Sequence, residues 1–427
     1  MTGTVLIGLF LLALVAGMPL ATGLGVASIA VLALVGFDQL AVPTNIYAGI
    51  AKYPLLAIPM FILAGMIFER SGVAVRLVRF VTAIVGEWTG SLAVVAVLVS
   101  MLLGGISGSG PADAAAVAAV MLPSMIARGY PKGFSAGLIA ASGSTAIVIP
   151  PSVAFIVYSV MVPAATVPAL FAAGLFPGMV AALCLLVPAI VISRRYGFGR
   201  DYKAERPPLG KSFIDAIWGL LAPVIILGGL RTGIFTPTEA AVVAVAYGIF
   251  VGMVIYRSID FKGLFRILVE AGELSAVVLM IIGIASVFAW AGNTLGIFDA
   301  AAKALVGLHS SEWLMLLSIN LLLLAAGMFL DAISIFLILL PLLVPIAVAM
   351  GWDLVWFGVM MTINLAIGQF TPPMAISLMI TSRIAGIGME ETFRWVIWLV
   401  LAMGAGLALM IVFPQLALWL PGKLGYL

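Results

Sequence analysis

The feature that most restricts the fold of this chain is an internal repeat whose landmarks are helix-breaking residues inside apolar segments. In the first part of each copy an offset of 218 relates three pairs: Pro19 with Pro237, Asp113 with Asp331, and Pro123 with Pro341. After a four-residue insertion the offset is 222 and relates three more: Gly129 with Gly351, Pro150 with Pro372, and Pro151 with Pro373. Two apolar halves with matching helix breaks are typical of secondary transporters.

The composition excludes a water-soluble globular domain. Of the 427 residues, 64% are hydrophobic and only 9% are charged, which is more apolar sequence than one water-excluded core can hold. The apolar runs are continuous, as in LLLLAAGMFL (321–330), whereas the spans of a β-barrel alternate apolar and polar residues. We therefore predict an all-α polytopic membrane protein.

Several functional classes are excluded by counting residues. The net charge of +3 is too small to indicate a nucleic-acid partner. Cys184 and His309 are the only residues of their kinds, which excludes bis-histidine haem, thiolate clusters and disulfides within the chain. We expect no cofactor and no transition metal. The amino terminus also lacks the basic region of a cleavable signal peptide.

Twelve apolar segments divide equally between the two halves: 4–18, 20–36, 45–68, 91–127, 132–162 and 168–193, then 214–230, 237–256, 274–292, 313–349, 354–383 and 394–420. Segments 91–127 and 313–349 are nearly twice the roughly 20 residues that cross a bilayer. Each is interrupted at its centre, by SGSGP (107–111) or by GMFLD (327–331). We predict two re-entrant helical hairpins whose tips line a site, because irregular backbone at membrane depth needs protein or a wet cavity around it.

The segment that follows each hairpin carries a Pro-Pro pair near its middle. The pairs lie in STAIVIPPS (144–152) and GQFTPPMAIS (368–377). Proline lacks an amide hydrogen and clashes with the preceding turn, so each pair ends one half-helix and pre-organises the next. We predict broken transmembrane helices over 132–162 and 354–383, with free carbonyls on one side of each break and free amides on the other.

These elements define the predicted domains. Each half has five true crossings, an odd number, so 1–193 and 213–427 form two inverted repeats joined by a basic linker, 194–212. The positive-inside rule places this linker in the cytoplasm and both termini outside; a single crossing over 4–36 would instead put the amino terminus inside. The basic residues of the linker region are Arg194, Arg195, Arg200, Lys203, Arg206 and Lys211.

The residues that can carry chemistry gather at the hairpin tips and the helix breaks. Sodium prefers hard oxygen ligands, supplied by carbonyls, hydroxyls and a few carboxylates. The predicted sodium ligands are Ser107, Ser109, Asp113, Ser144 and Thr145 in the first half, and Gly327, Asp331, Gln369 and Thr371 in the second. The predicted contacts of an anionic solute, between the half-helix amino termini, are Ser142, Pro150, Pro151, Pro372, Pro373 and Arg383.

Some of these residues also fit structural roles. Asp113 lies in a first helical turn, behind Gly110 as the cap and Pro111 at the first position, so it could serve the helix dipole. At membrane depth, however, a carboxylate is costly and is functional by default. For Asp331 we expect no role as a helix cap. Arg383 also fits a snorkelling anchor, and Thr236-Pro-Thr-Glu239 predicts a capping box that starts a helix.

Several strings are specific to one known family. GGISGSGPADAAAV (104–117), VIPPS (148–152), GIFTPTEAA (233–241), GMFLDAISIFLILLPLLVPI (327–346) and GQFTPPMAISLMI (368–380) resemble the large membrane subunit of tripartite ATP-independent periplasmic (TRAP) transporters. More distantly, the chain resembles the ion transporter superfamily with paired hairpins and broken helices.

The resemblance implies a sodium-coupled elevator importer in the bacterial inner membrane, with Asp113 and Asp331 at the acidic positions of the sodium sites. It implies carboxylate solutes such as C4-dicarboxylates or sialic acid, a separate four-helix membrane subunit, and a periplasmic binding protein.

Three other classes compete with this interpretation. Two aspartates at membrane depth could form the dyad of an intramembrane aspartyl protease, but Asp113 and Asp331 lack the Tyr-Asp and Gly-x-Gly-Asp contexts of those enzymes. A channel should show a selectivity filter or rings of pore charges, and neither is present. An ATP-driven pump needs a phosphate-binding loop, which the sequence also lacks.

Overall fold

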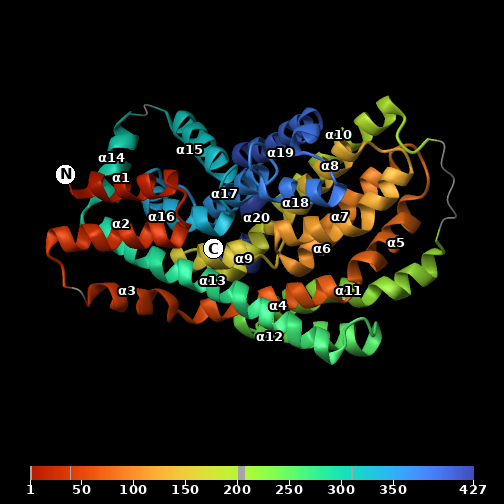
Figure 1. Ribbon diagram of the computed structural model, residues 1–427, viewed down its shortest axis with the longest axis horizontal. Helices are drawn as coiled ribbons and strands as arrows, with labels where there is room; N and C mark the ends of the chain where they lie inside the picture. The colour runs from red at the N-terminus through yellow and green to blue at the C-terminus, as the bar shows by residue number, and fades with distance from the viewer. Residues whose placement is uncertain (1, 39, 201–206, 309–310) are drawn as a thin grey trace.

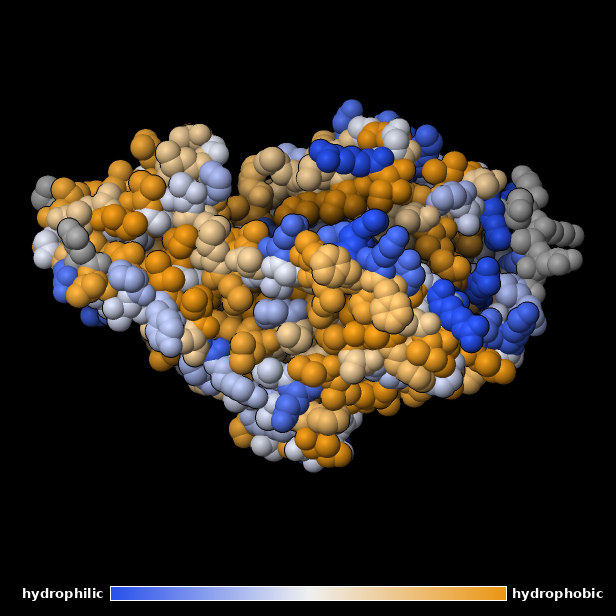
Figure 2. All heavy atoms as spheres, turned by 60° about the horizontal axis from the view of Figure 1, so that its bottom comes forward, coloured by the Kyte–Doolittle hydropathy of each residue, from blue (hydrophilic) through white to orange (hydrophobic). Residues whose placement is uncertain are grey.

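The computed structural model describes residues 2–38, 40–200, 207–308 and 311–427. Throughout these ranges the chain is helical, with twenty α-helices and no strand (Figure 1). Eight helical segments among the described residues are long and apolar enough to cross a membrane. Apolar side chains cover much of the face shown in Figure 2. The prediction of an all-α polytopic membrane protein is confirmed.

The first half of the chain forms ten α-helices: α1 (Thr2–Val15), α2 (Leu20–Val35), α3 (Ala41–Ile50), α4 (Ala57–Arg70), α5 (Val73–Val85), α6 (Ser91–Ser107), α7 (Gly110–Ala127), α8 (Lys132–Ser144), α9 (Val153–Met161) and α10 (Val167–Tyr196). Residues 4–36 therefore form two helices that pack against each other, not one continuous helix. Helices α6 to α9 occupy the two segments in which a hairpin and a broken helix were predicted.

The second half forms ten further α-helices. Its helices are α11 (Leu209–Arg231), α12 (Pro237–Ile249), α13 (Phe261–Thr294), α14 (Ile297–Leu308), α15 (Glu312–Gly327), α16 (Ala332–Ala349), α17 (Leu354–Gly368), α18 (Ile376–Ala385), α19 (Phe393–Val412) and α20 (Gln415–Leu424). The capping box at the start of α12 is confirmed, because Thr236 and Glu239 bond each other's backbone amides. Of the predicted linker 194–212, residues 201–206 lie outside the described part, and both its ends are helical.

Three predicted segments differ from the structure. Segment 45–68 is divided between α3 and α4, because Lys52 is exposed and Pro54 opens a separate 3-10 turn, Tyr53–Leu56. Segment 394–420 is divided between α19 and α20, where Pro414 cannot donate a helical hydrogen bond. Helix α13 begins 13 residues before the predicted start at 274, because charged residues such as Glu270 are tolerated at its first turns.

The hairpins and broken helices of the two halves interlock at the centre of the molecule. Helix α18 of the second half packs against α7 and α8 of the first, α17 packs against α15, and α10 packs against α19 and α20. Helices α3, α4, α12 and α13 pack beside one another along one side of this central group (Figure 1). The first predicted hairpin tip consequently lies inside the protein, whereas at the second tip Gly327 is buried and Phe329 is 56% exposed.

Candidate functional site

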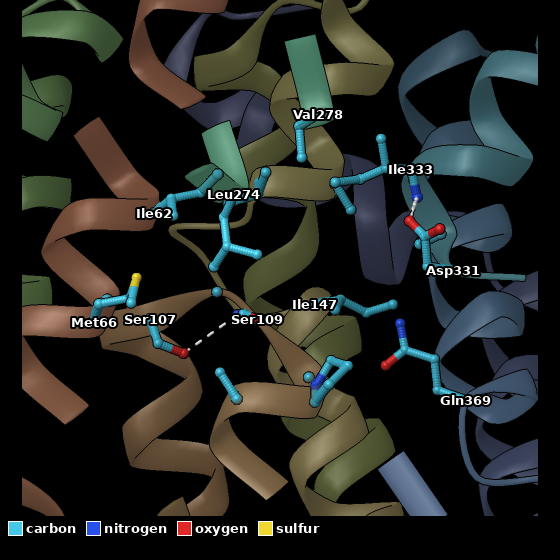
Figure 3. A pocket seen from close by; sticks show the side chains of 18 of the residues that line it. Ile62, Met66, Ser107, Ser109, Ile147, Leu274, Val278, Asp331, Ile333 and Gln369 are labelled. Atoms are coloured by element: carbon cyan, nitrogen blue, oxygen red, sulfur yellow. Dashed lines mark hydrogen bonds between the residues drawn. The ribbon is translucent and has the colours of Figure 1, made fainter. Parts of the chain in front are cut away.

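A cavity of about 230 Å³ lies where the two halves meet. Its lining comes from the first hairpin tip (107–112), the residues around the first break, the start of α16, and Gln369 at the second break. Helices α4 and α13 close the remaining side. Figure 3 shows Ile62 and Met66 of α4 on one side of this space and Asp331 and Gln369 on the other.

The first hairpin tip is held tightly against the first break. Gly108 has a φ of 64°, a left-handed conformation that favours glycine, and a Cβ there would lie 2.1 Å from the carbonyl oxygen of Pro151. A Cβ on Gly143 would lie 2.7 Å from the Cα of Ala114. Glycine at these positions therefore allows α7 and the α8–α9 break to approach at backbone distance.

Asp113 is buried behind this tip with one oxygen free. Its side chain is 2% exposed, and its Oδ1 accepts a 2.5 Å hydrogen bond from Ser107 Oγ. Its Oδ2 has no hydrogen-bond partner in the described structure. The carboxylate does not cap α7, and Ser109, not Gly110, occupies the N-cap position. The prediction of Gly110 as the cap is therefore wrong, whereas Asp113 does lie in the first turn of α7, as predicted.

The polar side chains of the first break bond locally. Ser144 Oγ donates to the Ala140 carbonyl at 2.8 Å, and Thr145 Oγ1 donates to the Ser142 carbonyl at 2.7 Å. Ser142 Oγ also lies 3.0 Å from Ser100 Oγ of α6. All of these hydroxyls are buried next to the hairpin, and their second lone pairs remain available as ligands.

Asp331 does cap a helix, contrary to the expectation from the sequence. It is the N-cap of α16, where its Oδ2 accepts from the amides of Ile333 at 3.0 Å and Ser334 at 3.2 Å, while its Oδ1 accepts from Ser334 Oγ. Aspartate is among the preferred N-caps because the first amides of a helix have no partner within the helix. The pattern Asp-x-x-Ser before an apolar run is the sequence signal that could have identified this role, and it was not used.

Gln369 connects the second break to the first hairpin. It is 3% exposed, its Oε1 has no hydrogen-bond partner in the described structure, and a Cβ on Gly110 would lie 2.4 Å from that oxygen. The other two predicted ligands lie near Gln369 in the fold: Thr371 Oγ1 donates to the Ile367 carbonyl at 2.6 Å, and Gly327 packs against Gly368, the residue before Gln369. Gln369 therefore lies beside residues of both halves.

Two polar residues of this region were not predicted. Asn364 of α17 is 2% exposed and donates to the Asn320 carbonyl at 2.9 Å and to Asn320 Oδ1 at 2.8 Å, while its own Oδ1 has no partner in the described structure. The repeat contains a signal for it, because the offset of 222 relates Ser142 to Asn364. Glu69 of α4 lines the cavity, and no pattern in the sequence marked it.

The predicted solute contacts lie away from the lining of this cavity. Pro150 and Pro151 are buried within the first break, Pro373 is exposed, and Arg383 is exposed at the last turn of α18. Ser142 is buried on the far side of the tip, against α6. The cavity instead meets the first residues of α7, α9 and α16.

Asp113 and Asp331 do not form the dyad of an aspartyl protease. Such a pair shares one proton between adjacent carboxyl groups. Here Asp113 bonds Ser107 and Asp331 bonds the first turn of α16, and no hydrogen bond joins the two in the described structure. The geometry gives the protease alternative no support.

Comparison with known proteins gives a consistent result. The family described as the tripartite ATP-independent periplasmic transporter, DctM component, matches residues 7–416. The chain is 36% identical to the C4-dicarboxylate TRAP transporter large permease protein DctM of Rhodobacter capsulatus over 100% of both chains. It is 38% identical to the sialic acid TRAP transporter large permease protein SiaM of Vibrio cholerae over 97% of both.

Two further matches extend the comparison. The 2,3-diketo-L-gulonate TRAP transporter large permease protein YiaN of Escherichia coli is 37% identical over 89% of both chains. The crystal structure of the Alcanivorax borkumensis YdaH transporter matches in fold, with a TM-score of 0.64 over 88% of this chain and 89% of that one at 15% identity. From the family match and the identity along the whole chain, this multi-pass membrane protein belongs to the DctM family and is the large permease subunit of a TRAP transporter, not an enzyme.

Proposed function

We propose that this chain is the translocating subunit of a sodium-coupled importer of carboxylate solutes. The observation that carries the proposal is a set of three buried oxygens without a hydrogen-bond partner among the described residues: Gln369 Oε1 in the cavity lining, and Asp113 Oδ2 and Asn364 Oδ1 outside that lining. Leaving such a group unsatisfied costs about 1–3 kcal/mol, and more if it is charged. A bound cation would remove that cost.

The first sodium ion is assigned to the tip and break of the first half. Asp113 Oδ2 supplies the charge, and Ser107, Ser109, Ser144 and Thr145 supply neutral oxygens. The second ion is assigned to Gly327, Gln369 and Thr371, with Asn364 added on the basis of its free oxygen. Both oxygens of Asp331 already accept hydrogen bonds, so Asp331 is not assigned as a direct ligand of this ion. It contributes negative charge to the region from the cavity wall.

The solute is proposed to be a carboxylate. The relatives named above handle C4-dicarboxylates, sialic acid or 2,3-diketo-L-gulonate according to their names, and all of these carry carboxylate groups. The amino-terminal residues of α7, α9 and α16 line the cavity, and helix amino termini favour anions. Direct contacts from Ser142, the four prolines or Arg383 would require a different arrangement of the breaks.

The transport cycle is proposed to be an elevator movement of the central hairpins and broken helices. The two halves, 1–193 and 213–427, have the same order of elements, which supports the inverted-repeat hypothesis. Lys52, between α3 and α4, donates a 3.2 Å hydrogen bond to the Val160 carbonyl of α9, a contact that such a movement would break.

Family membership implies a small membrane subunit and a periplasmic binding protein as partners in the bacterial inner membrane.

Uptake into proteoliposomes tests this function. Both membrane subunits would be reconstituted with the binding protein added outside, and labelled C4-dicarboxylate, sialic acid and 2,3-diketo-L-gulonate would be offered in turn. We expect uptake of one of these solutes only with an inward sodium gradient and only with the binding protein. Equal uptake when potassium replaces sodium would refute sodium coupling.

A further inference from the structure

An apolar groove with a basic end lies between α10 and α19, away from the cavity described above. Its volume is about 520 Å³. Six of its lining residues form two facing rows, Val187, Val191 and Arg195 on α10, and Arg394, Trp398 and Ala402 on α19.

The two rows are in antiparallel register. Residues in each row are four apart, so they share one helix face, and Arg195, near the end of α10, lies at the same end of the groove as Arg394, near the start of α19. Eight residues at 1.5 Å each give the groove a length of about 12 Å. The arginines therefore mark one end, Trp398 and Val191 the middle, and Ala402 and Val187 the other end.

The basic end has no acidic partner in the described part of the chain. Arg195 and Arg394 are exposed and no ion pair involves either, and Glu390 and Glu391 lie outside the groove lining. The Arg394 guanidinium lies 4.3 Å from the centre of the Trp395 ring, which holds it against the groove wall. Two guanidinium groups at the mouth of an apolar groove are complementary to a phosphate.

We propose that this groove binds one anionic phospholipid, with its phosphate between Arg195 and Arg394 and an acyl chain along the two rows. Val187, Val191 and Trp398 are 64%, 57% and 56% exposed, which suits contact with a hydrocarbon chain in a membrane. Basic pockets at the cytoplasmic ends of transmembrane helices bind anionic headgroups. A protein partner is less favourable, because it would bury two unpaired charges.

Lipid retention tests the proposal independently of transport. Arg195→Gln/Arg394→Gln would be compared with the wild type and with Arg79→Gln/Arg266→Gln, which removes two exposed charges from α5 and α13. Each protein would be purified and delipidated, and then titrated with phosphatidylglycerol or phosphatidylcholine and analysed by native mass spectrometry. We expect one phosphatidylglycerol per wild-type or control chain and at least about tenfold weaker binding by the groove variant, equivalent to 1.4 kcal/mol.

Equal phosphatidylglycerol binding by the groove variant and the control would overturn the proposal. A second variant, Ala402→Trp, tests the acyl part by filling the apolar end while keeping both arginines, and it should also lose the lipid. If soluble glycerol phosphate displaces the lipid at similar concentrations, the groove is an anion site and the acyl assignment is wrong. Preferential binding of phosphatidylcholine would contradict the role of the arginines.

Discussion

The aspartates of the two hairpin tips occupy equivalent places in the repeat and different environments in the structure. Asp113 lies inside α7, is almost completely buried, and accepts one hydrogen bond from Ser107. Asp331 precedes α16, lines the cavity, and accepts from Ile333 and Ser334. A carboxylate that has already bonded three donors has less capacity for a cation than one with an oxygen free. Equivalence in sequence therefore does not give equivalence in chemistry.

The comparison assigns different ligand types to the two halves. The first half offers a charged oxygen, Asp113 Oδ2, whereas the second offers the neutral amide oxygens of Gln369 and Asn364. A cation in the first half is therefore held by charge, and one in the second by dipoles. Charge removal should have its largest effect in the first half.

The largest effect is expected for Asp113→Asn. This change keeps the shape of the side chain and removes the only charge assigned to the first ion. Interactions with charged groups contribute about 1.5–3 kcal/mol, so the sodium concentration for half-maximal uptake should rise by at least about tenfold. Sodium titrations of uptake in proteoliposomes measure this midpoint concentration, and an unchanged midpoint would remove Asp113 from the ion site.

Packing variants test the close approach of hairpin and break. A Cβ on Gly368 would lie 2.6 Å from the Cα of Gly327, whereas a Cβ on Gly110 would lie 2.4 Å from the end of the Gln369 side chain and no closer than 3.2 Å to backbone, at the Ser144 Cα. Gly368→Ala should destabilise the protein by about 1–3 kcal/mol, as overpacking does, and Gly110→Ala by less. Gly404→Ala is the control, because a Cβ there meets nothing within 4 Å. Denaturation in detergent would rank the three variants by stability. Equal stability of all three would contradict the packing described.

Gln369→Met tests whether the free amide oxygen serves an ion. Removing an unsatisfied buried oxygen should leave stability without sodium unchanged or raise it by about 1 kcal/mol. The stabilisation that sodium gives the wild type should be reduced in the variant. Thermal unfolding with sodium or with choline measures both quantities, and undiminished sodium stabilisation would exclude Gln369 as a ligand.

The smallest effect is expected for Asp331→Asn. Asparagine is as good an N-cap as aspartate, so stability should change by only about a few tenths of a kcal/mol, whereas Asp331→Ala should cost about 1 kcal/mol. The sodium midpoint of uptake should shift by less than threefold in the asparagine variant. A shift as large as that of Asp113→Asn would show that the cap is a secondary role.

The sequence predicted the central elements well because their boundaries depend on local chemistry. Gly108 follows the end of α6, and a Pro-Pro pair separates α8 from α9 and α17 from α18, so these helix ends lie inside the segments where breaks were expected. The division at Pro414 was missed although its cause is equally local. The early start of α13 was missed because its charged first turns include Glu270, which pairs with Arg70 of α4, a contact between distant segments.

The candidate site could be predicted only in part. Ser107, Ser109, Asp331 and Gln369 line the cavity, because tips and breaks were the right places to search. The use of Asp331 as a cap was not recognised, because the repeat suggested the same role for both aspartates. Glu69 depends on how α4 packs, which no short pattern records, whereas Asn364 was missed although the offset of 222 pairs it with Ser142.

Direct sodium binding to the purified chain tests the central claim, that Asp113 and not Asp331 holds the charge-dependent ion. Equilibrium binding of radioactive sodium would be measured for the wild type, Asp113→Asn and Asp331→Asn in the same detergent. We expect saturable binding by the wild type, nearly the same affinity for Asp331→Asn, and loss of one sodium ion per chain for Asp113→Asn. Full binding by Asp113→Asn, or equal loss in both variants, would contradict this account.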